Sequence, residues 1–216
     1  MSMDDIKTIL IHVRESIRYQ FVCPQKRKLL KNRDFTWISS NCTGAIITHE
    51  LQCRFNTPTV NLFIRPSDFI KFVKNLDEYA EKEFKYEPEL SRNYGYPVAK
   101  LDDITVYFVH YHTFEEAVSK WKQRYARIDK ANIFIMMSEK DGCTYDDLQE
   151  FDKLPYKNKI VLTHKPYPEI KSAVYITGFE NQEQLGDVFR MRKLFSLTKY
   201  YDEFDFVKWL NEGKQM

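Results

Sequence analysis

The stretch FTWISSNCTGAIITHELQCRF, residues 35–55, decides the fold expected for this chain. Residues 35–40 read as a strand and residues 43–53 as a helix, with Asn41 and Cys42 in the turn between them. A strand-turn-helix junction carries the side chains of its turn beyond the sheet, where the helix offers free N–H groups and the positive end of its dipole. Such a place can lower the pKa of a cysteine, and it can equally hold a phosphate.

The alternation of strands and helices continues along the chain. Further strands are expected at 59–64, 104–111, 132–137, 159–163 and 173–177, helices at 4–20, 66–82, 113–127, 145–152 and 200–213, and a loop at 85–97. Apolar strands that alternate with helices are typical of α/β proteins, whose parallel sheets are covered on both faces. We therefore expect a mostly parallel sheet in a Rossmann-like three-layer arrangement, with an additional N-terminal helix.

The length and composition are those of one domain, residues 1–216, with a well-packed core. We divide it into an N-terminal helix and basic connector (1–33), a core (34–180) and a C-terminal helical segment (181–216). The 33 Lys and Arg nearly balance the 31 Asp and Glu, which argues against a nucleic-acid partner. The basic run within 26–33 is either a solvated connector or a surface that approaches anionic lipid or a lipid-linked substrate.

The cysteine pattern and the N-terminus predict a cytoplasmic protein. The four cysteines form no CxxC pair, so free thiols in a reducing compartment are expected and a metal site is not. There is no apolar run of membrane-spanning length and no signal-peptide pattern. The basic run would allow a place at the inner face of the membrane.

Polar and titratable residues follow several of the predicted strands. These are Ser39, Ser40, Asn41 and Cys42, then His110, Tyr111 and His112, then Ser138, Glu139, Lys140 and Asp141, and finally His164 and Lys165. If the strands are parallel, these side chains share one rim, which is where open α/β sheets bind ligands.

In the helix 113–127, Lys120, Arg124 and Arg127 form a basic stripe that is either solvated or pairs with an oxyanion.

Several motifs together resemble a bacterial family, domain of unknown function 1919. They are ISSNCTGAIITHEL, TPTVNLFIRPSDFIKFVKNLDEYAEKE, YPVAKLDDITVYFVHYHTFEEAVSKWKQRYARID and FDKLPYKNKIVLT, which span about residues 30–180. Family members recur in exopolysaccharide and capsule gene clusters, and some are labelled exopolysaccharide biosynthesis proteins or acetyltransferases. The chain departs from the family at Ala45, where relatives often carry a second glycine. The resemblance implies surface-polysaccharide production as the setting.

We expect an enzyme that transfers a group, with acyl transfer favoured, to a glycan or activated-sugar intermediate. The site centres on Cys42 as nucleophile and His110 as base, with Asp141 or Glu139 orienting the histidine. The remaining site residues bind substrate: Asn41 with the amides of Thr43 and Gly44 at an oxyanion, Arg124 and Arg127 at a donor phosphate, and His112 and His164 on the rim. The donor would be an acyl-CoA or a nucleotide sugar.

Two other functions fit the same residues. In the first, the turn and the two arginines bind the diphosphate of a nucleotide sugar, as in a glycosyltransferase, without a covalent step. In the second, the protein is a non-enzymatic partner of a polysaccharide assembly complex and docks through residues 26–33.

Overall fold

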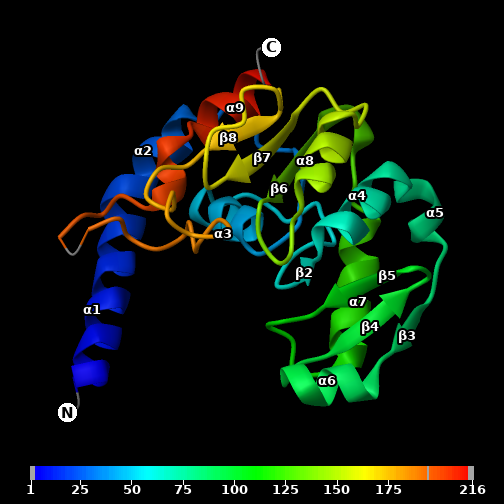
Figure 1. Cartoon of the computed structure of the whole chain (residues 1–216). Helices are drawn as coiled ribbons and strands as arrows, with labels where there is room; N and C mark the ends of the chain where they lie inside the picture. Colours follow the sequence, from blue (N-terminus) through cyan, green and yellow to red (C-terminus); the bar gives the residue numbers. More distant parts are fainter. Residues whose placement is uncertain (1–2, 194, 214–216) are drawn as a thin grey trace.

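A four-stranded parallel sheet forms the centre of the computed structural model, which describes residues 3–193 and 195–213 (Figure 1). Its strands are β1 (Thr36–Ser39), β6 (Ile133–Ser138), β7 (Lys159–Thr163) and β8 (Ala173–Tyr175), in the order β1-β6-β7-β8. All neighbouring pairs are parallel. The turn from β1 into α3 (Thr43–Glu50) lies at the carboxyl end of an outer strand of this sheet.

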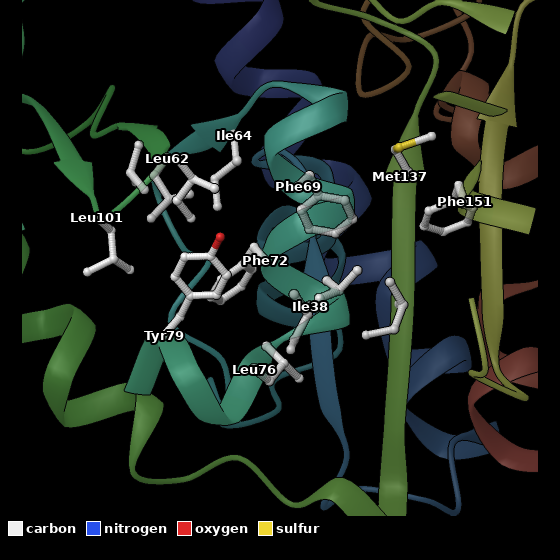
Figure 2. Close-up of a cluster of buried hydrophobic side chains, with 14 of the residues drawn as sticks. Ile38, Leu62, Ile64, Phe69, Phe72, Leu76, Tyr79, Leu101, Met137 and Phe151 are labelled. Atoms are coloured by element: carbon white, nitrogen blue, oxygen red, sulfur yellow. The ribbon is translucent and has the colours of Figure 1, made fainter. Parts of the chain in front are cut away.

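Helices cover both faces of the parallel sheet because side chains alternate along each strand. Trp37 packs on one face against Trp209 of α9 (Phe206–Glu212), with ring centroids 5.4 Å apart, and α3 packs on the same face. Ile38 points to the other face, beside Phe69 and Phe72 of α4 (Pro66–Lys74) (Figure 2). Helix α8 (Tyr145–Asp152) packs into the same cluster as α4. The predicted α/β fold is confirmed.

A second, antiparallel sheet accounts for the other strands. Its strands are β2 (Phe63–Ile64), β5 (Ile104–Tyr107), β4 (Val98–Leu101) and β3 (Phe84–Tyr86), in the order β2-β5-β4-β3. Our expectation that strand 104–111 joins the parallel sheet was therefore wrong. Strands β4 and β5 form a tight hairpin, in which Asp102 takes the left-handed φ of 57° that hairpin turns of this kind require.

The segment 85–97 is also ordered differently from the predicted loop. It contributes most of β3 and the short helix α6 (Pro88–Tyr94), which ends at Gly95 with a φ of 76°. Proline at the first helical position and glycine just after the last are favourable helix boundaries. The Pro and Gly that suggested a loop are these two helix ends.

The two sheets meet at the end of β1. The N–H of Ile64 in β2 donates to the carbonyl oxygen of Ser40 at 2.9 Å. Helix α4 contacts α8, β5 and β6, so it packs between the sheets. One hydrophobic cluster consequently runs from the parallel sheet to Leu101 of the antiparallel sheet (Figure 2). The residues after β1 therefore lie where the two sheets join.

The N-terminal helix is present and is longer than the predicted 4–20. Helix α1 (Met3–Ile17) passes through a π-helical turn (Arg18–Val22) into α2 (Cys23–Leu29). The remaining elements are α5 (Leu76–Ala80), α7 (Phe114–Tyr125), and 3-10 turns at Lys130–Asn132 and Tyr200–Glu203. The predicted C-terminal helix is thus divided into a 3-10 turn and α9. The single-domain division stays a prediction.

Arg18 ties the N-terminal helix to the body of the protein. Its guanidinium is 1% exposed and donates two hydrogen bonds of 2.9 Å to the carboxylate of Glu50. It donates two more, of 2.7 and 2.8 Å, to Asp202. Lys199 adds an ion pair of 3.1 Å to Glu50. Burial alone would raise the pKa of Glu50, but the bonds from Arg18 and the charge of Lys199 outweigh it and lower the pKa to about 2.

Replacing Arg18 should strongly destabilise the fold. Arg18→Met leaves two buried carboxylates without their main partner, so we expect the free energy of unfolding to fall by about 3–5 kcal/mol. Chemical denaturation followed by circular dichroism measures it. The matched control is Arg190→Met, whose side chain is 73% exposed and pairs with Asp187 at the surface. It should change stability by no more than about 0.5 kcal/mol, and equal losses for both variants would contradict this role of Arg18.

The same network predicts loss of stability in acid. Because the pKa of Glu50 is lower in the folded chain than its ordinary value of about 4.5, its contribution is complete above that value and disappears as the pH falls toward 2. The lowered pKa corresponds to about 3 kcal/mol. Denaturation curves at stepwise lower pH measure this loss. Exposed Glu183 provides the control: Glu183→Gln should follow the wild-type pH profile, whereas Glu50→Gln should lose less stability between pH 5 and pH 2.

Candidate functional site

The turn after β1 fixes the first turn of α3. Cys42 is the N-cap residue, and the side-chain oxygen of Asn41 accepts a hydrogen bond of 3.0 Å from the N–H of Thr43. Gly44 lies against β1, where an added Cβ would come within 2.7 Å of the Cβ of Ser39. Gly44 therefore allows the close packing of α3 on the strand. The Thr43 amide, expected at an oxyanion, is already occupied by Asn41.

Two cavities lie next to this turn. Cavity 1, of about 610 Å³, lies between the N-terminal helical segment, α3 and α7, and its lining includes Tyr19, Phe55 and Arg124. Cavity 2, of about 490 Å³, lies toward the carboxyl ends of β1 and β6, and its lining includes Asn41, Tyr96 and Asp141. Both are lined by Cys42, Ile46 and His110. These three residues form what we call the shared wall.

Cys42 is a protonated thiol in this environment. Its sulfur is partly buried and donates to the carbonyl oxygen of Leu62 at 3.6 Å. Burial raises its pKa to about 11, and the nearby charge of Asp141 contributes to the increase. A helix terminus can lower the pKa of a cysteine, but removal of the sulfur from water is the larger effect at Cys42.

His110 and Asp141 reach the shared region from different elements. His110 lies beyond β5, and its side chain is exposed where the two cavities adjoin. Asp141 follows β6 in a left-handed conformation with a φ of 58° and lines cavity 2. Burial raises the pKa of Asp141, and the charges of Lys140 and Arg65 partly offset that increase. The structure therefore brings a thiol, an imidazole and a carboxyl group to one place.

Of the three residues of the predicted basic stripe, only Arg124 lines cavity 1 or cavity 2. It lines cavity 1 and donates a 2.6 Å hydrogen bond to the hydroxyl of Tyr111, which in turn donates to the carbonyl of Val60 at 3.1 Å. Arg127 lines neither cavity and donates to the carbonyl of Phe55 at 3.2 Å. Lys120 is exposed. The basic stripe is thus divided between a cavity wall, a loop contact and solvent.

Glu139 and His164 pair with each other away from the shared wall. The Glu139 carboxylate accepts from the backbone N–H of His164 at 2.9 Å and lies 2.6 Å from its Nδ1. The hydroxyl of Tyr167 donates to the other carboxylate oxygen of Glu139 at 2.5 Å. Both Glu139 and His164 are about 5% exposed, and neither lines cavity 1 or cavity 2. Glu139 is therefore not in place to orient His110.

The predicted site residues fall into two groups. Asn41, Cys42, Thr43, His110, Arg124 and Asp141 line one or both cavities, whereas Gly44, His112, Arg127, Glu139 and His164 line neither. His112 is exposed. In the basic run, Lys26 pairs with Asp202 and Arg27 donates to the carbonyl of Glu50 at 2.7 Å, so part of this run is structural.

Several lining residues were not anticipated from the sequence. Cavity 2 also contains Phe63, Tyr96 and Asp187, and Asp187 forms an ion pair with Lys140 of the predicted rim. The ring of Phe63 stacks on Tyr107 at 4.3 Å and 6°. Asp187 comes from the segment 185–189, all of which lines cavity 2 and which precedes the 3-10 turn Tyr200–Glu203. No local pattern marks these positions, because long-range packing brings them to the site.

Sequence comparison agrees with the resemblance. A family model described as domain of unknown function, DUF1919, matches residues 12–211. The chain belongs to this DUF1919 family. It is 46% identical over 193 residues to an uncharacterized protein of Haemophilus influenzae (strain ATCC 51907 / DSM 11121 / KW20 / Rd), covering 89% of this chain and 92% of that protein. The matched range includes every residue of the shared wall, so the site belongs to the part of the chain that defines the family.

Metal-ion clusters and membrane-spanning helices are both absent from the described residues. Within residues 3–193 and 195–213, no three His, Cys, Asp or Glu side chains cluster in a way that would hold a metal ion. In the same ranges, no helix has the length and apolar character needed to cross a membrane.

Cys42 should react slowly with alkylating reagents at neutral pH. Because its pKa is raised to about 11, the thiolate fraction and the alkylation rate should rise about tenfold per pH unit between pH 7 and pH 9. Peptide mass spectrometry after timed labelling with iodoacetamide follows Cys42 separately from the other three cysteines. Fast labelling at pH 7 that levels off below pH 8 would instead indicate an activated thiolate.

Proposed function

We propose that this protein transfers a group, an acyl group ahead of a glycosyl group, to a glycan or activated-sugar intermediate in bacterial surface-polysaccharide production. The observation that carries the proposal is the shared wall of Cys42, Ile46 and His110 between the two cavities. Direct transfer needs two adjoining binding sites that hold the reacting atoms in contact. The polysaccharide setting rests on the family resemblance.

Cavity 2 is the better site for the sugar. Asn41, Asp141 and Asp187 supply hydrogen-bonding groups suited to sugar hydroxyls, and Phe63 and Tyr96 supply flat apolar surfaces. A site of this kind, with an apolar wall and a few polar groups, fixes the orientation of a small ligand. The sugar would lie between the rings and the carboxylates, with one hydroxyl directed toward His110.

Cavity 1 is the better site for the donor. Tyr19, Ile46, Phe55 and Val60 give it apolar walls, and Arg124 supplies a cation. An acyl-CoA carries both an apolar acyl-pantetheine portion and phosphates. The guanidinium of Arg124 has one hydroxyl partner, Tyr111, and its planar group can also bind a phosphate oxygen.

In the acyl reaction, the sugar hydroxyl oxygen attacks the carbonyl carbon of an acyl thioester. A carbon–oxygen bond forms and the carbon–sulfur bond breaks. His110 accepts the hydroxyl proton and passes it to the leaving thiolate. The raised pKa of Cys42 favours this direct route over a covalent acyl-enzyme, because little thiolate is present at neutral pH.

A nucleotide-sugar donor is the second candidate, and Arg124 favours it. The guanidinium lies in the wall of cavity 1, where it can hold a diphosphate without covalent chemistry. Thermal melting of the wild type with acetyl-CoA and with nucleotide sugars separates the donors, since a ligand stabilises the folded state that binds it. Arg124→Lys should reduce the stabilisation by the donor.

His110→Gln should lower transfer by about 10²–10⁴-fold through loss of the base. The assay incubates the protein with acetyl-CoA and a panel of nucleotide sugars and detects acetylated sugar by mass spectrometry. His112→Gln is the matched control, because His112 lies two residues away, is exposed and lines neither cavity. It should retain full activity.

Cys42→Ser separates the two routes in the same assay. Direct transfer predicts that this variant keeps most of its activity, whereas a covalent route predicts its loss. Equal activity of His110→Gln and wild type would contradict the role of His110. No turnover and no stabilisation by either class of donor would leave the non-enzymatic partner as the function.

A further inference from the structure

Large exposed apolar side chains concentrate on the N-terminal helical segment. Ile9, Leu10, Val13 and Ile17 lie on one side of α1, because positions three and four apart share a helix face. Their exposed fractions are 39–50%. We call these four residues the apolar stripe. Helix α1 extends away from the body of the protein (Figure 1), so this stripe is open over much of its length.

A loop tip lies beside the same helix. Residues 190–193 and 195–199 form a loop closed by the bridge between Met191 and Lys199. Arg14 of α1 donates to the carbonyl oxygens of Lys193 at 2.5 Å and Ser196 at 2.7 Å. These bonds hold the tip against α1. Phe195 at this tip is 95% exposed, the highest value among the exposed large apolar residues of the described chain.

The segments that carry this apolar surface are rich in positive charge. Residues 1–33 contain eight Lys and Arg against three acidic residues, and residues 190–199 contain four against none. The rest of the chain is acidic, with 21 Lys and Arg against 28 Asp and Glu. Some of these cations pair internally, as Arg18 does, but Lys28, Lys31 and Lys193 are exposed. Of these, Lys193 lies in the loop that contacts α1, and Lys28 and Lys31 follow in the same N-terminal segment. An apolar helix face in a segment with exposed cations is complementary to an anionic lipid surface.

A second copy of the chain fits this surface less well. In a coiled coil whose seam is Leu10, Val13 and Ile17, the flanking positions are Arg14 on one side and Ile9, which extends the stripe, with Ser16 on the other. Neither a parallel nor an antiparallel pair would then place opposite charges across the interface. The charge pattern therefore favours an anionic membrane over a helix of the same kind.

We propose that the apolar stripe and Phe195 dock this protein onto the surface of a membrane that contains anionic phospholipid. Helix α1 lies in the plane of the interface with its stripe among the acyl chains, and Phe195 inserts beside it. Glu15, Ser16 and Tyr19 of the same helical segment line cavity 1. Docking therefore brings cavity 1 close to the lipid surface. This inference is independent of the transferase reaction.

Co-sedimentation of the full chain with vesicles tests the proposal. We expect binding to vesicles of phosphatidylcholine mixed with phosphatidylglycerol, weaker binding to phosphatidylcholine alone, and release as salt screens the charges. Phe195→Ser and the double variant Leu10→Ser, Val13→Ser should each weaken partitioning by about tenfold or more. Tyr145→Ser is the control, since Tyr145 is a 43% exposed aromatic residue on α8. It should bind as the wild type does.

Three outcomes would overturn the proposal. The first is absence of binding to either vesicle by a wild-type protein with a native melting curve. The second is binding that the stripe and Phe195 variants leave unchanged. The third is a dimer, measured by sedimentation velocity, that Leu10→Ser, Val13→Ser dissociates without any vesicle binding by the wild type. That third result would assign the stripe to a second copy of the chain.

Discussion

The paired bonds of Arg18 to Glu50 and Asp202 are the interaction on which the arrangement of the chain depends. A guanidinium that is 1% exposed cannot remain charged inside a protein without partners. Its two carboxylates come from α3 and from the 3-10 turn near the C-terminus. Three distant segments are thereby fixed together. Glu50 is the last residue of α3, and Cys42 is at its N-cap position. The network therefore fixes the C-terminal end of the helix whose N-terminal half contributes to the shared wall.

The site results from the way the two sheets meet. The bond from Ile64 to the carbonyl of Ser40 places β2 next to the turn after β1. The antiparallel sheet can then present His110 to the same space as Cys42. Helix α4 fills the interior between the sheets with Phe69 and Phe72. Packing and one backbone hydrogen bond thus bring together residues that lie more than 60 positions apart in the sequence.

Two opposing effects act on the pKa of the Cys42 thiol, and the geometry of the turn determines which is larger. A helix N-terminus stabilises a thiolate, whereas burial destabilises it. Here burial is the larger effect and raises the pKa to about 11. The N–H of Thr43, which could have faced an anion, bonds to Asn41 instead. The turn therefore presents a neutral thiol and polar side chains, and the exposed imidazole of His110 becomes the group best placed to move a proton.

The sequence by itself determined the local elements. Alternating and helical apolar patterns predicted β1, α3, β6, α8 and β7. Periodicity encodes such elements because each depends on which face its own residues bury. It also predicted the turn that holds Asn41 and Cys42.

Only the tertiary structure decided which sheet each strand joins and which side chains share a cavity. Strand β5 has the apolar pattern of a buried parallel strand, yet it pairs with β4 through the hairpin at Asp102. Glu139 and Asp141 both follow β6, but the carboxylate of Glu139 pairs with the ring of His164 instead of lining a cavity. Tyr96 and Asp187 enter cavity 2 from segments with no distinctive pattern. Pairing between strand edges and contacts between distant side chains depend on the whole packed chain, which no local window of sequence contains.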